Sequence, residues 1–307
     1  MGIRTTAAGE DDVSALDFLQ LQVASRTEGK PRERGLTMVM DQGWPIEFVD
    51  GMLDAFGPYL DVVKLWDPLL LSSVGHLRRR VQMYLSHDVL VQPGGLFLET
   101  AQQQDKSRDV LKRLRELDFD CVEVSSTTST RGDLDDHAQL VRDAVDLGYK
   151  VVGEVGRKFA DGDETRLSER VIDPDVTVGE FTALLEAGAW KVYWEGHLLR
   201  KVMGDDPETI HAQAGTGTQQ VLDVVRRVGQ DNIMFEVSGL RPRENRQWLQ
   251  FWLVRTFGPD VNIANARIEE MANLEAIRRG NHPIFGFGNA GNYPWMRSRS
   301  VERWWRT

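Results

Sequence analysis

Eight short apolar stretches alternate with eight amphipathic stretches along this chain of 307 residues. Short runs that are apolar throughout are typical of parallel strands covered on both faces. We expect strands at residues 36–41, 61–66, 89–92, 121–125, 150–158, 191–195, 233–237 and 261–265. The helices expected after them cover residues 45–55, 72–86, 97–117, 133–147, 178–187, 219–228, 243–257 and 268–279. This alternation predicts the α/β class, with a single (β/α)8 TIM-type barrel favoured over an open doubly wound sheet.

The predicted barrel occupies residues 31–280 and leaves an extension at each end. Residues 1–30 are polar apart from one amphipathic patch, and we interpret them as an N-terminal extension. Residues 281–307 combine three tryptophans with four arginines and predict a C-terminal appendage that packs on the barrel or contacts another subunit. We therefore expect a homo-oligomer.

The composition excludes several classes of partner. A net charge of −10 gives little electrostatic support for binding nucleic acid. No apolar run approaches the roughly 18 residues of a membrane span, so no membrane partner is expected. The single cysteine, Cys121, rules out an internal disulfide, which fits a reducing compartment and a cytoplasmic protein. A small anionic molecule is the partner that we expect.

Four predicted strands each carry one glutamate near their end. These residues are Glu123, Glu154, Glu195 and Glu236. Their spacings of 31, 41 and 41 residues match roughly one strand-plus-helix unit each. Active sites of such barrels lie where the strands end, so the four carboxylates should meet at one mouth.

The other four strands also end in polar residues, and we expect these to point into the same mouth. They are Asp41, Lys64, Gln92 and Asn265. The ordinary interpretation of any one of them is a solvated strand end. As a set, however, five acids together with Lys64, Arg157 and Lys158 are hard to explain by solvation. The basic residues suit an anionic substrate, and His197, close behind Glu195, is a candidate acid–base group.

Carboxylates gathered at one mouth repel one another unless a cation compensates them. A hard divalent ion would do so, and Mg²⁺, or Mn²⁺ in its place, takes oxygen ligands while keeping waters for a substrate. We expect the ligands among Glu123, Glu154, Glu195 and Glu236. The chain has no cluster of histidine and cysteine residues for zinc, and no nucleotide, phosphate-loop or nucleophile-elbow motif, so no organic cofactor is expected.

Several motifs, taken together, resemble the phosphosulfolactate synthase family. The longest is Glu154-Val155-Gly156-Arg157-Lys158, and the others lie at residues 30–32, 34–37, 41, 63–64, 93–95, 97, 99, 122–125, 195–196, 235–236, 261–265, 274–275 and 278–280. The resemblance spans about residues 30–280. It implies a Mg²⁺-dependent barrel enzyme of the carbon–sulfur lyase type that adds sulfite to phosphoenolpyruvate, the first step towards the sulfonate coenzyme M.

The resemblance also implies roles for individual residues. The metal held by the glutamates would stabilise an enolate-like state, and Lys158 would protonate C2 beside the catalytic Glu154. Lys64 and Arg157 would hold the phosphate or carboxylate. The remaining substrate-binding candidates are Asp41, Gln92, Ser125, Asn265 and Arg200.

The loops that would face the substrate differ from the family pattern. Leu65-Trp66-Asp67-Pro68-Leu69 stands where the family has Gly-Trp-Gly-Thr-Ser, and residues 197–200 replace its Arg-Glu-Ser-Gly. One alternative is therefore a related barrel enzyme in specialised metabolism that uses another acceptor or nucleophile. A second alternative is a non-catalytic barrel relative with a stress or scaffold role.

Overall fold

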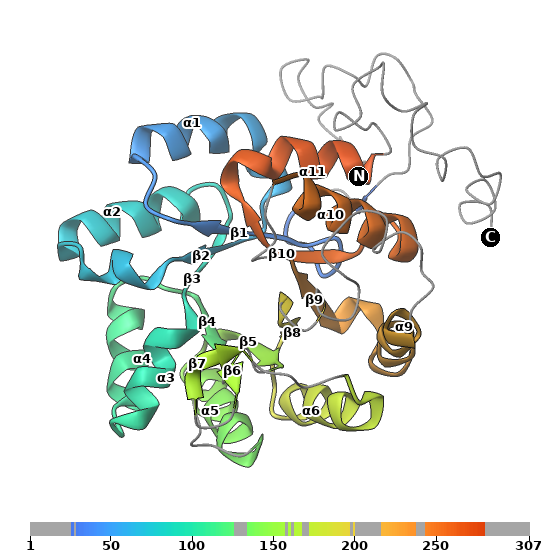
Figure 1. Cartoon of the computed structure of the whole chain (residues 1–307). Coiled ribbons are helices and arrows are strands. Elements are labelled where there is room, and N and C mark those ends of the chain that lie inside the picture. Colours follow the sequence, from blue (N-terminus) through green and yellow to red (C-terminus); the bar gives the residue numbers. More distant parts are fainter. Residues whose placement is uncertain are drawn as a thin grey trace, which may run out of the picture.

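In the computed structural model, eight parallel strands form a nearly closed barrel that is surrounded by helices (Figure 1). The structure describes residues 26–27, 29–125, 134–156, 159–160, 163–167, 172–196, 199, 216–237 and 243–279. The predicted (β/α)8 fold is thereby confirmed. The two predicted extensions, apart from the few residues of the first that are described, lie outside these ranges.

The barrel strands pair in the order β3-β2-β1-β10-β9-β8-β5-β4. Their bounds are β1 (Thr37–Asp41), β2 (Val62–Leu65), β3 (Leu90–Pro93), β4 (Cys121–Val124), β5 (Lys150–Val155), β8 (Lys191–Trp194), β9 (Ile233–Glu236) and β10 (Asn262–Arg267). Strands β3 and β4 are the two ends of this sheet. They are linked by the amide of Val91, which donates a 2.7 Å hydrogen bond to the carboxylate of Asp120.

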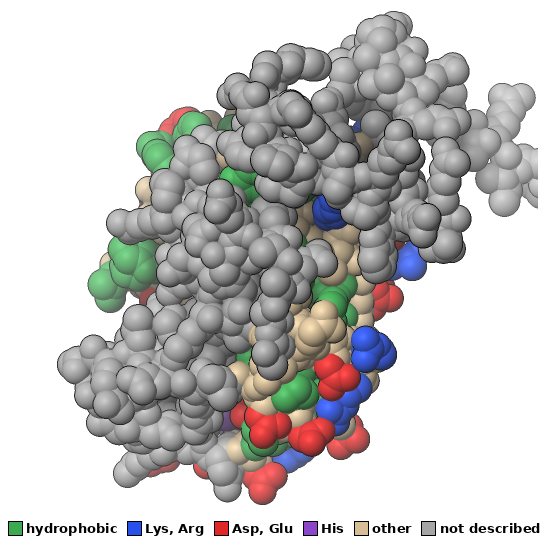
Figure 2. Space-filling model, turned by 45° about the vertical axis from the view of Figure 1, so that its right-hand side comes forward, with side chains coloured by type: hydrophobic (Ala, Val, Ile, Leu, Met, Phe, Trp, Pro, Cys, Tyr) green, Lys and Arg blue, Asp and Glu red, His purple; other side chains and the backbone are tan. Residues whose placement is uncertain are grey.

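The helices lie on the outside of the barrel (Figure 1), and Figure 2 shows Asp and Glu side chains beside Lys and Arg side chains on the described part of one face. They are α1 (Ile46–Phe56), α2 (Val74–Leu85), α3 (Gly95–Gln103), α4 (Ser107–Glu116), α5 (Leu134–Asp146), α6 (Pro174–Glu186), α9 (Thr216–Val228), α10 (Arg243–Phe257) and α11 (Met271–Arg278), with short 3-10 turns η3 (Gly57–Tyr59), η4 (Asp67–Leu71), η5 (Gln230–Asn232) and η6 (Ile268–Glu270).

The structure corrects two of the predicted elements and adds a strand pair. The single helix expected over 97–117 is two helices, α3 and α4, separated at Asp105, whose φ of 56° is incompatible with a continuous helix. The strand expected over 150–158 ends at Val155. An antiparallel pair, β6 (Phe159–Ala160) and β7 (Asp163–Leu167), follows it and was not predicted.

Two apolar layers alternate along each strand. Val152 lies in the interior cluster of the barrel, whereas Val151 and Val155 lie in the larger cluster between the strands and the helices. Between them, Gly153 allows α6 to approach closely, because a Cβ atom there would lie 2.9 Å from Cδ1 of Leu184. Glu154, which has the same parity as Val152, therefore faces the barrel interior.

A network of arginines lies at the N-terminal face of the barrel. Arg26 binds Glu275 at 3.0 Å, and Arg32 binds Asp61 at 2.7 Å, and all four side chains are buried. The barrel contacts thus include Arg26, which precedes the boundary expected at residue 31. None of the described helices has the length and apolar character needed to cross a membrane.

Candidate active site

A buried lysine lies among the carboxylates at the C-terminal mouth of the barrel. The ammonium of Lys64, on β2, is 2.7 Å from Oε2 of Glu123 on β4 and 3.2 Å from Oε1 of Glu236 on β9. All three residues lie at the mouth, as expected from the sequence. Lys64 is predicted to bind a substrate anion, and in the structure its ammonium contacts these two glutamates. Lys64 supplies a compensating cation from within the chain.

The electrostatics of this cluster depend on burial and on charge crowding. Burial alone would lower the pKa of Lys64, but Glu123, Glu236 and Glu154 outweigh it and raise that pKa above its ordinary value. Burial raises the pKa of Glu123 to about 7, and Glu236 adds to this effect while Lys64 opposes it. Lys64 therefore stays protonated, whereas Glu123 changes its charge near neutral pH.

Glu154 experiences the same crowding with less relief. Burial raises its pKa well above the ordinary value, and the neighbouring carboxylates Glu236, Glu123 and Glu195 raise it further, with Lys64 acting against them. Glu195, at the end of β8, is buried as well. These shifts place all four predicted glutamates in one electrostatic cluster.

We expect the stability of the folded protein to fall between about pH 5 and pH 8 in metal-free buffer, because the folded-state pKa of Glu123 is raised from 4.5 to about 7. The folded state then binds more protons than the unfolded state in this range, so its extra stability is present at low pH and is lost as pH rises through 7. Thermal melts of the wild type and Glu123→Gln across this range test the prediction. A slope unchanged by Glu123→Gln would contradict it.

A chain of hydrogen-bonded polar side chains supports Glu123 in the barrel interior. Nε2 of Gln92 donates to Oε2 of Glu123 at 3.1 Å and to the hydroxyl of Tyr193 at 2.9 Å, and the thiol of Cys121 donates to Oε1 of Gln92 at 3.2 Å. The ring of Tyr193 also lies 4.8 Å from the ammonium of Lys64. Gln92 thus holds Glu123 in place. Tyr193 was missed, although it shares the strand parity of Glu195.

The N-terminus of α3 packs against one side of the cluster. The hydroxyl of Ser125 donates a short hydrogen bond to Glu99 on α3. A Cβ atom at Gly95 would lie 2.3 Å from the oxygen of Ser125 and 2.7 Å from Oε1 of Glu123, so only glycine fits there. Ser125, a predicted substrate-binding residue, is therefore near Glu123. Glu99 was not among the candidate site residues.

Asp67 was also missed, and it extends the acidic cluster outwards from η4. Its carboxylate lies against Gly94, where a Cβ atom would be 2.5 Å from Oδ2. Burial raises the pKa of Asp67, while the positive charge of Lys64 lowers it. A negative charge thus occupies the N-terminus of α3 near the mouth.

The prediction that Asp41 faces the mouth is wrong. Its carboxylate forms a 2.6 Å ion pair with the guanidinium of Arg80 and accepts a 2.9 Å hydrogen bond from the hydroxyl of Tyr84. Both of these residues lie on α2. Met38, three residues earlier in the same strand, belongs to the interior cluster. Successive side chains of a strand point to opposite faces, so Asp41 points outwards. Its role is to anchor α2 to β1.

Asn265 is buried in β10, beside the strand that carries Glu236. Its φ of 55° lies in the left-handed region, and the pairing of β10 with β1 shifts register at this point. The predicted site residues Arg157, Lys158, His197 and Arg200 lie outside the described residues.

The donor chemistry of the cluster suits a hard divalent cation. The described part of the mouth holds four clustered carboxylates and the ammonium of Lys64, to which Glu123 and Glu236 each give one oxygen. No three acidic, histidine or cysteine side chains converge on a common metal position among the described residues. Mg²⁺ fits this arrangement, because it is commonly held by one or two carboxylates and keeps several waters.

The fold and the cluster define a class of protein, a (β/α)8-barrel protein with an acidic, lysine-containing site at the C-terminal ends of its strands. A profile described as (2R)-phospho-3-sulfolactate synthase (ComA) matches residues 25–283. The chain therefore belongs to the phosphosulfolactate synthase family, which confirms the resemblance, and membership supports a lyase-type function.

Three relatives bear the name phosphosulfolactate synthase. That of Methanothermobacter thermautotrophicus is 31% identical over 270 residues, covering 87% of this chain and 96% of the relative. That of Methanocaldococcus jannaschii is 30% identical over 250 residues, covering 81% of this chain and 92% of the relative. That of Bacillus subtilis is 26% identical over 267 residues, with 86% and 96% covered. The similarity thus spans the whole barrel, at the level of a divergent member.

Proposed function

We propose that this protein is a phosphosulfolactate synthase-like lyase that adds sulfite, or a related nucleophile, to phosphoenolpyruvate. Family membership supports the reaction type. The single observation that carries the proposal is the buried ammonium of Lys64, held between Glu123 and Glu236 at the end of the barrel where such enzymes place their active sites.

The reaction needs positive charge at a fixed place. The sulfite sulfur would form a bond to C3 of phosphoenolpyruvate, and the electrons of the C2–C3 double bond would move to C2 and its carboxylate. A proton delivered to C2 then completes the addition. A cation fixed beforehand lowers the barrier most where this negative charge develops. Lys64 has a fixed position and stays protonated, so it suits that task.

Mg²⁺, or Mn²⁺ in its place, would be held at Glu154 and Glu195, with the oxygens of Glu123 and Glu236 that do not contact Lys64 as further donors. When bound, the ion would act as a Lewis acid on substrate oxygens. Arg157 and Arg200 would bind the phosphate or carboxylate, and Lys158 would deliver the proton. Gln92 would keep the carboxylate of Glu123 turned towards Lys64.

We expect phosphoenolpyruvate to be consumed only when sulfite and Mg²⁺ are both present, and we expect Glu154→Gln to abolish this consumption. Loss of the enol absorbance, with product identification by mass spectrometry, provides the measurement. Glu116→Gln, an exposed carboxylate on α4, is the matched control and should retain full activity. Equal consumption with and without Mg²⁺ would remove the metal from the proposal.

Asp67 favours a second candidate, a related enzyme with another acceptor or nucleophile. Its carboxylate at the N-terminus of α3 competes electrostatically with a substrate anion near Lys64. If phosphoenolpyruvate is consumed with a nucleophile other than sulfite, this second candidate replaces the first. If the protein neither binds nor consumes phosphoenolpyruvate under any of these conditions, both lyase assignments that use this acceptor fail.

A further inference from the structure

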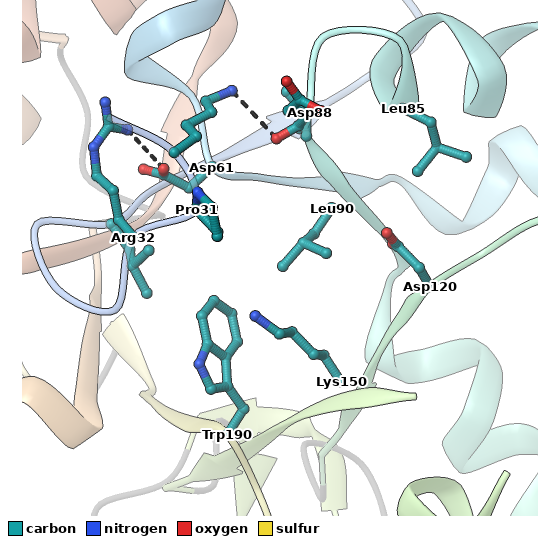
Figure 3. Close-up of a pocket in the computed structure, with 12 residues that line it drawn as sticks. Pro31, Arg32, Asp61, Leu85, Asp88, Leu90, Asp120, Lys150 and Trp190 are labelled. Carbon is teal, nitrogen blue, oxygen red and sulfur yellow. Dashed lines mark hydrogen bonds and ion pairs between the residues drawn. The ribbon is translucent and has the colours of Figure 1, made fainter. Parts of the chain in front are cut away.

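A cavity of about 380 Å³ opens on the N-terminal face of the barrel, at the opposite end from the glutamate cluster (Figure 3). Its wall includes Pro31, from the segment before β1, and Leu90, Asp120, Lys150 and Trp190, which lie at or just before the starts of β3, β4, β5 and β8. Small-molecule sites in proteins commonly occupy roughly 300–1,000 Å³. The cavity is therefore large enough for a ligand of its own.

An aromatic ring and an ammonium form one wall of this cavity. The ammonium of Lys150 lies 4.1 Å from the ring centroid of Trp190, and both side chains project into the same space in Figure 3. The indole is fixed, because its Nε1–H donates a 2.6 Å hydrogen bond to Glu33. Glu33 is 3.9 Å from Lys150, which is a weak ion pair on the rim. Lys150 thus presents a positive charge beside a rigid apolar surface.

A second ammonium, that of Lys30, also belongs to the cavity lining. Lys30 donates to the carbonyl oxygens of His87 at 2.9 Å and Asp88 at 3.3 Å. Carbonyl oxygens solvate an ammonium but do not neutralise its charge. Burial lowers the pKa of Lys30 to about 8, which an anion bound nearby would reverse. The third basic residue, Arg32, is neutralised by Asp61 at 2.7 Å.

Acidic residues limit how much negative charge the cavity accepts. The Asp120 carboxylate accepts a 2.7 Å hydrogen bond from the amide of Val91, and its pKa is raised by burial. Asp88 adds a second carboxylate at the edge. With the Arg32–Asp61 pair set aside, the lining holds two ammonium groups and two carboxylates. The two ammonium groups can bind one carboxylate, while the two acidic side chains disfavour a phosphate or another dianion. Leu85 and Leu90 add apolar side chains to the lining.

From this arrangement we propose that the cavity binds a small monocarboxylate with an aromatic or aliphatic body. The carboxylate lies between Lys150 and Lys30, and the body packs against Trp190 and Leu90. This site is separate from the glutamate cluster and independent of the reaction proposed there.

The test uses the full chain and three probes with one phenyl body: 3-phenylpropionate, 3-phenylpropanamide and 2-phenylethylamine. Isothermal titration should show binding of the acid, and binding at least tenfold weaker for the amide and the amine. Lys150→Met retains most of the side-chain volume and should abolish the preference for the acid. Lys112→Met, an exposed lysine on α4, should leave binding unchanged. Glu154→Gln, at the other end of the barrel, should also leave it unchanged.

Several results would overturn the proposal. One is equal binding of the acid and the amide, and another is acid binding that survives both Lys150→Met and Trp190→Leu in variants shown by circular dichroism to be folded. The third is loss of acid binding in Glu154→Gln, which would assign the probe to the mouth. Absence of binding by all three probes to the wild type at millimolar concentration would also overturn it.

Discussion

Replacing Lys64 by methionine should lower the free energy of unfolding by about 3–5 kcal/mol at pH 8, the usual cost of removing one partner of a buried ion pair. Lys64 is buried and contacts Glu123 and Glu236 at 2.7 and 3.2 Å. In the variant, these two carboxylates remain buried but have lost the ammonium that Lys64 provides. Urea unfolding of both proteins in metal-free buffer gives the difference.

The free energy of unfolding lost in Lys64→Met should be smaller at pH 5, because the glutamates can then become neutral by binding protons. Adding Glu123→Gln to Lys64→Met should restore part of the stability at pH 8, since it removes one of the uncompensated charges. Lys112→Met is the control for a lysine without buried partners. A loss below about 1 kcal/mol at pH 8, or a loss independent of pH, would show that Lys64 does not compensate these acids.

The sequence predicted the barrel because its signal repeats. Each strand is a short apolar run bounded by turn residues, and eight repetitions make the alternation unambiguous even where single boundaries are wrong. The same repetition placed Glu123, Glu154, Glu195 and Glu236 at equivalent strand ends. Since parallel strands bring these ends together, the gathering of the four acids at one mouth could be predicted without coordinates.

The direction in which a polar strand end points was less predictable. A strand buried on both faces has no contrast between a polar and an apolar side, so β1 gave no sign that Met38 faces inwards and Asp41 outwards. The partner that decides the matter, Arg80, lies on α2, one strand and one helix further along the chain. A sequence read alone does not reveal this pairing.

The partner of Lys64 was unpredictable for a related reason. A lysine among acids can bind a substrate anion or the acids themselves, and strand spacing is the same in both cases. The tertiary distances show that Glu123 and Glu236 contact the ammonium. The same holds for Asp67, because its contact with Gly94 depends on how η4 folds over α3.

Lys158→Met should lower kcat by about 10²–10⁴-fold, the usual contribution of a general acid, if the proposed addition reaction is correct. The lysine follows Glu154 by four residues, just beyond the end of β5. Metal binding should survive, because no glutamate is changed. Steady-state kinetics with phosphoenolpyruvate and the active nucleophile measure the effect, with Lys112→Met as the control.

The geometry around Lys64 gives the reason for assigning the proton to another residue. Neighbouring carboxylates raise the pKa of Lys64, so it holds its proton too tightly to deliver it to carbon. Lys158→Arg keeps the positive charge but gives up a proton far less readily, and should therefore fail almost as badly as Lys158→Met. Recovery of most of the rate with arginine would instead make Lys158 an electrostatic clamp. His197, which follows Glu195 by two residues, would then be the next proton donor to test.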